Sequence, residues 1–255
     1  MKRIAGFLLL SIFWLACSED NHTARLNVML TDAPGDYEEV NIDIQGVEIH
    51  ISGGNQNSGW TSLDVEHGVY NILKLTNGLD TLLATAELPA GKISQIRLIL
   101  GDNNSVKING ITKALSTPSA QKSGLKLNLH AELTEGIAYT ITLDFDAARS
   151  IVKRGNGTYS LKPVIRALER ATTGAIRGTV TPLDAAPAVF AINGADTVAT
   201  AYTDDAGKFI LRSIPAGTYT VSFDPKAGYV PIKKENVSVT LGNVVDLGII
   251  TIEKE

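Results

Sequence analysis

The chain has 255 residues, of which 27 are acidic and 23 are basic, so its formal net charge is −4 at pH 7. A chain with this balance lacks the basic face that phosphate binding requires, which excludes nucleic acid as an expected partner. The single cysteine, Cys17, excludes an intramolecular disulfide, and the length suggests one large domain or two ordinary ones.

Residues 1–16 have the pattern of a secretory signal peptide. Lys2 and Arg3 precede an apolar run that ends at Ala16 and is too short to span ~30 Å of hydrocarbon. The segment ending in Ala16-Cys17 resembles the cleavage box of bacterial lipoproteins, although Trp14 and Leu15 replace the usual residues. The resemblance implies that the mature chain begins at a lipidated Cys17. The alternative is an ordinary signal peptide with an incidental cysteine.

Residues 17–24 are expected to form a short lipidated tether. Ser18-Glu19-Asp20 resembles the acidic export tag of surface lipoproteins in the Bacteroidota, which implies an outer-membrane protein displayed on the cell surface. The periplasmic face is the alternative location. About seven residues separate Cys17 from the first strand, a reach of roughly 24 Å. We therefore expect the first domain to lie close to the membrane and the second to face outward.

The first domain, expected over residues 25–167, is dominated by period-two alternation of apolar residues, which predicts β-strands. The apolar positions change parity at Gln45-Gly46, which predicts a β-bulge that keeps one face of a long strand on the core. Asn109-Gly110 predicts a hairpin turn. The segment 69–83 fits either a helical turn or strand ends. The alternating segments 125–133 and 137–145 are predicted to form an antiparallel pair.

Several stretches of this region resemble the bacterial envelope family known as the domain of unknown function 4382. The resemblance implies no established activity and no site. The stretches are Thr31-Asp32-Ala33-Pro34, Leu88-Pro89-Ala90-Gly91 with Gln95-Ile96-Arg97-Leu98, Thr117-Pro118-Ser119 with Gly124-Leu125-Lys126, the segment 144–151 and Leu161-Lys162-Pro163-Val164-Ile165.

Charged residues within these stretches are candidate ligand-binding residues. Asp144 and Asp146 are expected on the strand face opposite Leu143 and Phe145. Together with other charged side chains they would form an acidic pocket for a cation or a sugar hydroxyl, or else a set of ion pairs and loop caps, which is the more common role. No loop spacing indicates a calcium site. The full candidate set is Asp32, Trp60, Asp144, Asp146 and Arg149.

A linker is expected at residues 168–173, followed by a second domain over residues 174–255 with seven short strands, which favour a small β-sandwich. Its motifs resemble the carboxypeptidase regulatory-like domain, a transthyretin-like sandwich. The matching motifs are Ile176-Arg177-Gly178-Thr179-Val180, the segment 203–209 and the segment 214–221. The fold class is therefore predicted to be all-β, with two antiparallel sandwiches.

The four histidines, at positions 22, 50, 67 and 130, show no metal-ligand spacing, and no nucleophile motif is present. We therefore expect no enzyme activity, no metal site and no cofactor. Two functions are left open: a binding module for glycan or an envelope protein, and a structural spacer in an envelope complex. Sugar stacking would have to use Trp60, Tyr37, Tyr70, Tyr202 or Tyr229.

Overall fold

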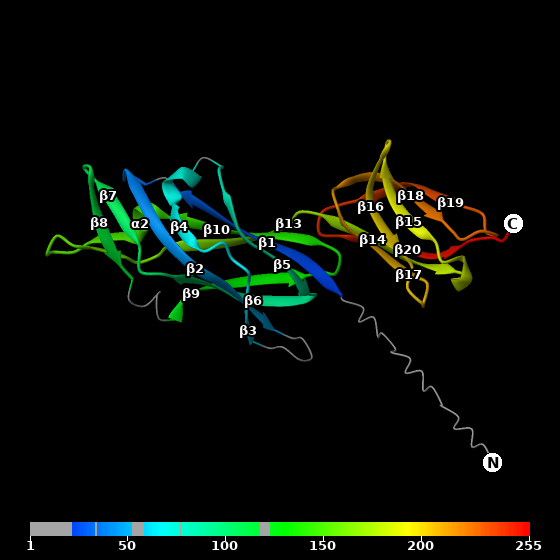
Figure 1. The fold of residues 1–255 in the computed structure, drawn as a ribbon, viewed down its shortest axis with the longest axis horizontal. Helices are drawn as coiled ribbons and strands as arrows, with labels where there is room; N and C mark the ends of the chain where they lie inside the picture. Colours follow the sequence, from blue (N-terminus) through cyan, green and yellow to red (C-terminus); the bar gives the residue numbers. More distant parts are fainter. Residues whose placement is uncertain (1–21, 34, 53–58, 77, 118–122) are drawn as a thin grey trace, which may run out of the picture.

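Two all-β domains follow each other along the long axis of the molecule (Figure 1). The computed structural model describes residues 22–33, 35–52, 59–76, 78–117 and 123–255. Within this part of the chain the predicted fold class, two β-sandwich domains, is confirmed. The expected signal peptide lies outside the described residues.

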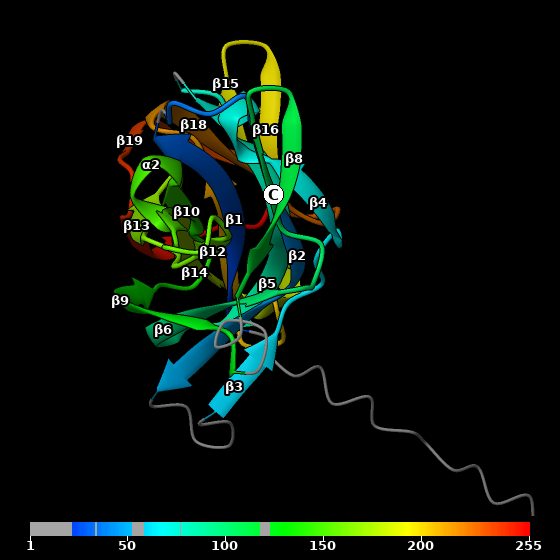
Figure 2. The same cartoon turned by 90° about the vertical axis from the view of Figure 1, so that its left-hand side faces the viewer.

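The first domain is a sandwich of two sheets, which Figure 2 shows nearly end-on. Its smaller sheet contains, in spatial order, β13 (Ile165–Ala171), β10 (Ala138–Asp146), β1 (Thr23–Ala33) and β5 (Thr81–Pro89). Its larger sheet contains β11 (Ile151–Lys153), β12 (Tyr159–Leu161), β8 (Ile111–Ser116), β7 (Ser105–Ile108), β2 (Glu39–Ser52), β6 (Gly91–Leu100) and β9 (Leu125–Leu133). β3 (Gly59–Ser62) and β4 (Gly68–Asn71) pair with β2 outside this path.

The second domain is a smaller sandwich of the same kind. One sheet contains β17 (Lys208–Ile214), β14 (Gly174–Thr181) and β20 (Val244–Thr251). The other contains β16 (Asp196–Tyr202), β15 (Ala188–Asn193), β18 (Gly217–Asp224) and β19 (Ile232–Val239). The number of strands, seven, agrees with the prediction. Both domains also contain parallel pairs, which the alternation alone does not indicate: β1 with β10 and β12 with β8 in the first domain, and β14 with β20 in the second.

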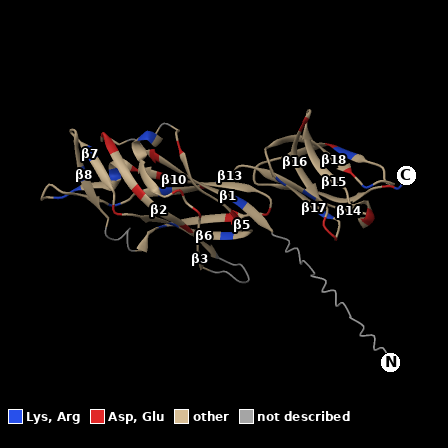
Figure 3. Ribbon diagram, viewed as in Figure 1, with Lys and Arg blue, Asp and Glu red and all other residues tan. Residues whose placement is uncertain are grey.

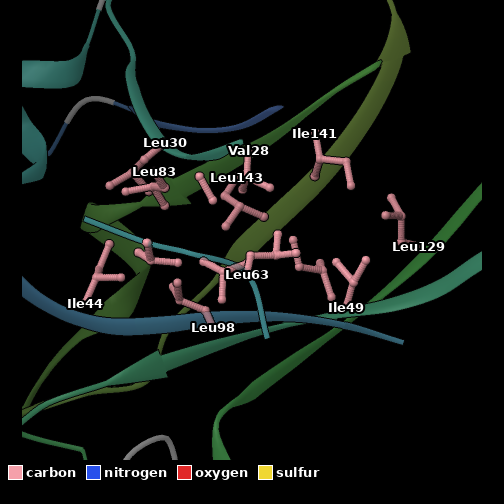
Figure 4. Packing of buried hydrophobic residues seen from close by; sticks show 14 of the residues in the cluster. Val28, Leu30, Ile44, Ile49, Leu63, Leu83, Leu98, Leu129, Ile141 and Leu143 are labelled. Atoms are coloured by element: carbon pink, nitrogen blue, oxygen red, sulfur yellow. The ribbon is translucent and has the colours of Figure 1, made fainter. Parts of the chain in front are cut away.

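The core of the first domain lies between the inner faces of its two sheets. Figure 4 shows Val28 and Leu143 from the small sheet facing Ile49 and Leu98 from the large one. All four side chains are fully buried. Burial of a side chain of this size contributes roughly 1.5–3 kcal/mol, so the alternating apolar face is what holds the sheets together.

The predicted bulge in β2 is confirmed. The pairing of β2 with β6 shifts register between Ile44 and Gly46, and the apolar residues on both sides of the shift are buried. Without the extra residue, the second half of β2 would turn its apolar face to solvent. The predicted hairpin at Asn109-Gly110 is also confirmed, since it joins β7 to β8.

The predicted antiparallel pairing of segments 125–133 and 137–145 is wrong. β9 pairs with β6 in the large sheet, whereas β10 pairs with β1 and β13 in the small sheet. The turn between β9 and β10 therefore crosses from one layer of the sandwich to the other. Alternation of apolar residues shows that each strand has one buried face. The same alternation is expected whether the two strands pair in one sheet or face each other across the core.

The remaining segments of the first domain are resolved as follows. The ambiguous segment 69–83 contains the end of β4, a short 3-10 helix η1 (Ile72–Leu75) and the start of β5. The expected linker at residues 168–173 is mostly a strand, because β13 continues to Ala171 in register with β10. A short helix, α2 (Ala147–Ser150), follows β10, and in the second domain a 3-10 helix, η2 (Leu183–Ala185), follows β14.

The two domains are joined by contacts that converge on the turn between β9 and β10. Gly136 in this turn accepts a hydrogen bond from the Ser213 amide of β17 at 2.7 Å. Arg212 donates to the Thr23 carbonyl at 3.0 Å and to Glu135 Oε1 at 2.8 Å. Ala175 of β14 belongs to the buried core of the first domain. The junction is therefore a packed and hydrogen-bonded contact.

Candidate functional site

Three of the predicted site residues come together at the ends of β1 and β10. The parallel register places Thr31 opposite Asp144 and Ala33 opposite Asp146, so that Asp32 lies between the two acids along the sheet. Asp144 and Asp146 lie on the face opposite the buried Leu143 and Phe145, as predicted.

Asp32 points into the core rather than toward solvent. It has the same parity as Leu26, Val28 and Leu30, and only 5% of its surface is exposed. Its Oδ1 accepts a hydrogen bond from the Ala147 amide at 3.1 Å, and its Oδ2 has no hydrogen-bond partner among the described residues. Burial raises the pKa of Asp32 to about 7, against the opposing effect of the Ala147 amide. The neighbouring charges of Asp144 and Asp146 make smaller contributions to the same rise in pKa.

The other two acids have structural partners. Asp144 forms an ion pair with Arg166 on the adjacent strand β13. Asp146 caps α2, since its Oδ1 accepts from the Arg149 amide at 2.9 Å, and its Oδ2 lies 3.8 Å from the Arg149 guanidinium. Within the described ranges no group of three or more His, Cys, Asp or Glu residues is arranged to hold a metal ion. The acids thus fix strand ends and a helix start.

Trp60 lies on β3, which pairs with β2 of the large sheet, and is not part of the acidic group. The Arg97 guanidinium lies 3.9 Å from the centre of the ring and also forms a salt bridge with Glu48, at 2.8 Å. The Lys126 ammonium lies 5.6 Å from the ring, and His50 meets it edge-on at 5.3 Å. These contacts are cation–π and aromatic interactions that cover the ring within the protein.

Of the other aromatic residues that could stack on a sugar, Tyr202 is the most accessible. Tyr37 and Tyr70 pack against the first core, and Lys254 lies over the ring of Tyr229 at 5.6 Å. Tyr202, at the end of β16, is 75% exposed. No ring or cation contact covers it among the residues that the structure describes.

Tyr202 lines a cleft of about 520 Å³ on the outer face of the β17-β14-β20 sheet, closed on one side by the first domain. A volume of this size falls in the range of small-ligand sites. The first domain contributes His22 and Glu135. The second domain contributes Arg177, Gly178, Thr179, Tyr202, Asp204, Lys208, Phe209, Ile210, Arg212 and Asp246.

The charges in the cleft are balanced and mostly paired. Arg177 Nε donates to Asp246 Oδ2 at 3.0 Å, and the Gly248 amide and then Arg177 hold the pKa of Asp246 below its usual value. Glu135 bonds Arg212 through Oε1 and lies 2.7 Å from His22 Nδ1 through Oε2. The cleft therefore offers donors and acceptors side by side, next to one exposed aromatic ring.

The surface outside the cleft shows no strong bias of charge. Figure 3 shows basic and acidic residues interspersed over both domains. No helix among the described residues is long and apolar enough to cross a membrane. Cys17, the predicted lipidation site, lies outside the described residues.

The sequence indicates Tyr202 as one of five aromatic candidates but does not reveal the cleft. Glu135 and Arg212, which close the cleft, are 77 residues apart and belong to different domains. No spacing pattern connects them. The burial of Asp32 does have a sequence signal, because this acid continues the alternating apolar positions of β1.

Two family descriptions match the chain. The family described as a domain of unknown function (DUF4382) matches residues 23–163, and the carboxypeptidase regulatory-like domain matches residues 175–253. Among proteins of curated function, none matches this chain.

Among solved structures, one similar chain is in a type II cohesin–X-dockerin complex from Acetivibrio cellulolyticus. It shares 29% identity over 32% of this chain and 58% of its own length, with a TM-score of 0.26. The minor pilin GBS52 of Streptococcus agalactiae shares 11% identity over 90% of this chain and 96% of its own length, with a TM-score of 0.27. Scores of this size do not establish a common overall fold, so we transfer nothing from these proteins.

The DUF4382 match covers more than half of the chain and coincides with the first sandwich. The second match coincides with the second sandwich, in the order that the sequence motifs predict. The chain belongs to the DUF4382 family, and its family domain is followed by a carboxypeptidase regulatory-like domain.

Proposed function

We propose that this protein is a non-catalytic, lipid-anchored binding module of the bacterial outer membrane, displayed on the cell surface, that binds a glycan in the cleft beside Tyr202. The observation that carries the proposal is the combination of an exposed aromatic ring with a polar cleft of about 520 Å³. Sugars present apolar C–H faces that stack on aromatic rings, and hydroxyl groups that both donate and accept hydrogen bonds.

The residues of the cleft suit such a ligand. Lys208 and Arg177 supply donors, and Asp246 supplies an acceptor, all on neighbouring strands of one sheet. Because positive and negative groups are balanced, the cleft favours a neutral saccharide over a strongly charged one. The non-catalytic part of the proposal is supported by the structural partners of the acids at the ends of β1 and β10.

A glycan array probed with the soluble body, residues 18–255, tests the proposal. We expect binding to a subset of glycans, its loss in Tyr202→Ala and its retention in Trp60→Ala, whose ring is covered by Arg97. Loss of glycan binding in Trp60→Ala but not in Tyr202→Ala would contradict the cleft as the binding site and would indicate a site at the large sheet of the first domain. Absence of binding to any glycan would contradict the glycan proposal and leave an envelope protein as ligand.

The anchor is a separate part of the proposal. Metabolic labelling with a fatty acid should mark the wild-type protein and fail to mark Cys17→Ser. If Cys17→Ser were still labelled and normally processed, this result would contradict the proposal that Cys17 is lipidated. Digestion by protease added to intact cells would support the cell surface, and protection would support the periplasmic face.

A structural spacer is the second candidate function. It is favoured by the bonded contact between the domains, in which Ser213 and Arg212 of β17 both bind the first domain. A junction of this kind holds two sandwiches in one extended body, as a spacer requires (Figure 1).

A further inference from the structure

The chain enters the folded body at the junction between the two domains and not at an end of the molecule. The His22 carbonyl accepts from the Ala90 amide at 2.9 Å, and His22 Nδ1 lies 2.7 Å from Glu135. The next carbonyl, of Thr23, accepts from Arg212 of the second domain at 3.0 Å. In Figure 1 the start of β1 lies beside the second domain, while β7 and β8 lie at one end of the molecule and the C-terminus at the other.

The tether is shorter than either domain. His22 is already fixed, so only five residue steps separate it from Cys17, a reach of at most about 17 Å. β1 has 11 residues and leads from the junction toward the far end of the first domain, a length of about 36 Å. β14 has 8 residues and leads from the junction into the second domain for about 26 Å.

These lengths restrict how the body can sit on a membrane. If the protein stood on the far end of either domain, His22 would be farther from the lipid than the tether can reach. We therefore propose, on the basis of the proposed anchor at Cys17, that the surface around the domain junction faces the membrane and that both domains lie alongside it. The partner of this surface is the lipid headgroup layer.

Two consequences follow from this orientation. His22 lines the cleft, so the cleft lies within the reach of the tether from the headgroups, and a glycan carried by the same membrane can enter it. A body held at its middle does not extend its full length from the membrane, which argues against the spacer role. The sequence-based expectation that the first domain lies nearer the membrane and the second faces outward is replaced by an arrangement in which both lie at similar heights.

The test measures the height of three positions above a bilayer. The probe is the body from Ser18 with a hexahistidine tag in place of residues 1–17, bound to vesicles that contain nickel-chelating lipid and a headgroup acceptor dye. Removal of Cys17 leaves no cysteine, so single cysteines can carry a donor dye. The positions are the exposed Ala90 beside His22, Thr112 near the β7–β8 turn and Ala227 near the C-terminus.

We expect the highest energy transfer from the dye at Ala90→Cys, and lower, similar values from Thr112→Cys and Ala227→Cys. A value at either end position above that at Ala90→Cys would overturn the proposal. As a control, a tag moved to the C-terminus should make Ala227→Cys the highest. Because the artificial anchor does not need lipidation, and glycan binding is measured in solution, this result is independent of the tests of the proposed function.

Discussion

Arg212 in β17 and Glu135 in the turn before β10 form a hydrogen-bonded ion pair of 2.8 Å between the two domains. Each residue also has a second partner, the Thr23 carbonyl for Arg212 and His22 for Glu135. This network closes the cleft on one side and fixes the point at which the N-terminal segment leaves the body.

Replacement of Arg212 is expected to weaken the contact between the domains. Arg212→Ala removes the hydrogen bonds to the Thr23 carbonyl and to Glu135, and because the ion pair is partly exposed we expect a loss of about 1–2 kcal/mol. Hydrogen exchange should show faster exchange at the Ser213 and Gly136 amides. Arg177→Ala is the control, since its ion pair with Asp246 lies within the second domain. Equal effects of both variants on these amides would contradict the role of Arg212.

A side chain at position 136 is expected to lower stability at the contact between the domains. Its φ is +78°, and a Cβ would lie 2.8 Å from Ile210 Cδ1 and 3.1 Å from Ala175 Cβ, both in the second domain. Gly136→Ala should therefore lose about 1–2 kcal/mol from backbone strain and a further amount from displacement of the second domain. Gly194→Ala, with φ +62° and no atom within 4 Å of its Cβ, isolates the strain. The measurement is denaturant unfolding. An equal loss in free energy of unfolding for the two variants would contradict a steric cost at the contact between the domains.

The buried Asp32 predicts a specific dependence of stability on pH. Its pKa of about 7 in the folded protein lies above its ordinary value of 3.8, so the folded chain binds the proton more tightly. The resulting contribution of Asp32 to the free energy of unfolding is full below about pH 4 and is lost as the pH rises to about 7. The free energy of unfolding changes over this range by on the order of 4 kcal/mol at most.

Asp32→Asn keeps an acceptor for the Ala147 amide and removes the titrating group. The difference in free energy of unfolding between wild type and Asp32→Asn should therefore change between pH 4.5 and pH 8, with the wild type losing more. Subtraction of the variant removes the contributions of other titrating groups, although Asp144 and Asp146 interact with Asp32. A difference that stayed constant over this range would contradict the raised pKa.

Arg97 is expected to matter more than Lys126 to the surroundings of Trp60. Arg97→Ala uncovers the ring and leaves Glu48, whose side chain is 19% exposed, without its cation, which should lose about 2–3 kcal/mol. Lys126→Ala removes a more distant contact and should change stability by less than about 1 kcal/mol. Trp60 fluorescence reports both unfolding and exposure of the ring. A larger red shift in Lys126→Ala than in Arg97→Ala would reverse the assignment.

The fold could be predicted from the sequence where the signal is local. Alternation located the strands, and the parity change at Gln45-Gly46 located the bulge in β2, because a strand must keep one face on the core. Alternation does not decide which strands pair, so it wrongly predicts β9 and β10 as neighbours in one sheet, although they lie in opposite layers. The parallel pairing of β1 with β10 joins segments more than 100 residues apart, and no local pattern encodes it.

The candidate site could likewise be predicted only where its signal is local in the sequence. The convergence of Asp32, Asp144 and Asp146 depends on the β1–β10 register, and their structural roles became visible only with their partners Ala147, Arg166 and Arg149. Tyr202 could be named only as one of five aromatic candidates, and its exposure became known from the structure. Its cleft depends on the contact between two domains, which arises from packing at Gly136 and Arg212 and has no counterpart in residue spacing.

Titration of the soluble body with the strongest glycan from the array tests the central claim most directly. Loss of the aromatic ring in Tyr202→Ala should weaken binding by about tenfold, whereas Tyr202→Phe, which keeps the ring, should stay within about threefold of wild type. The same affinity in Tyr202→Ala as in wild type would contradict the assignment of the cleft as the binding site.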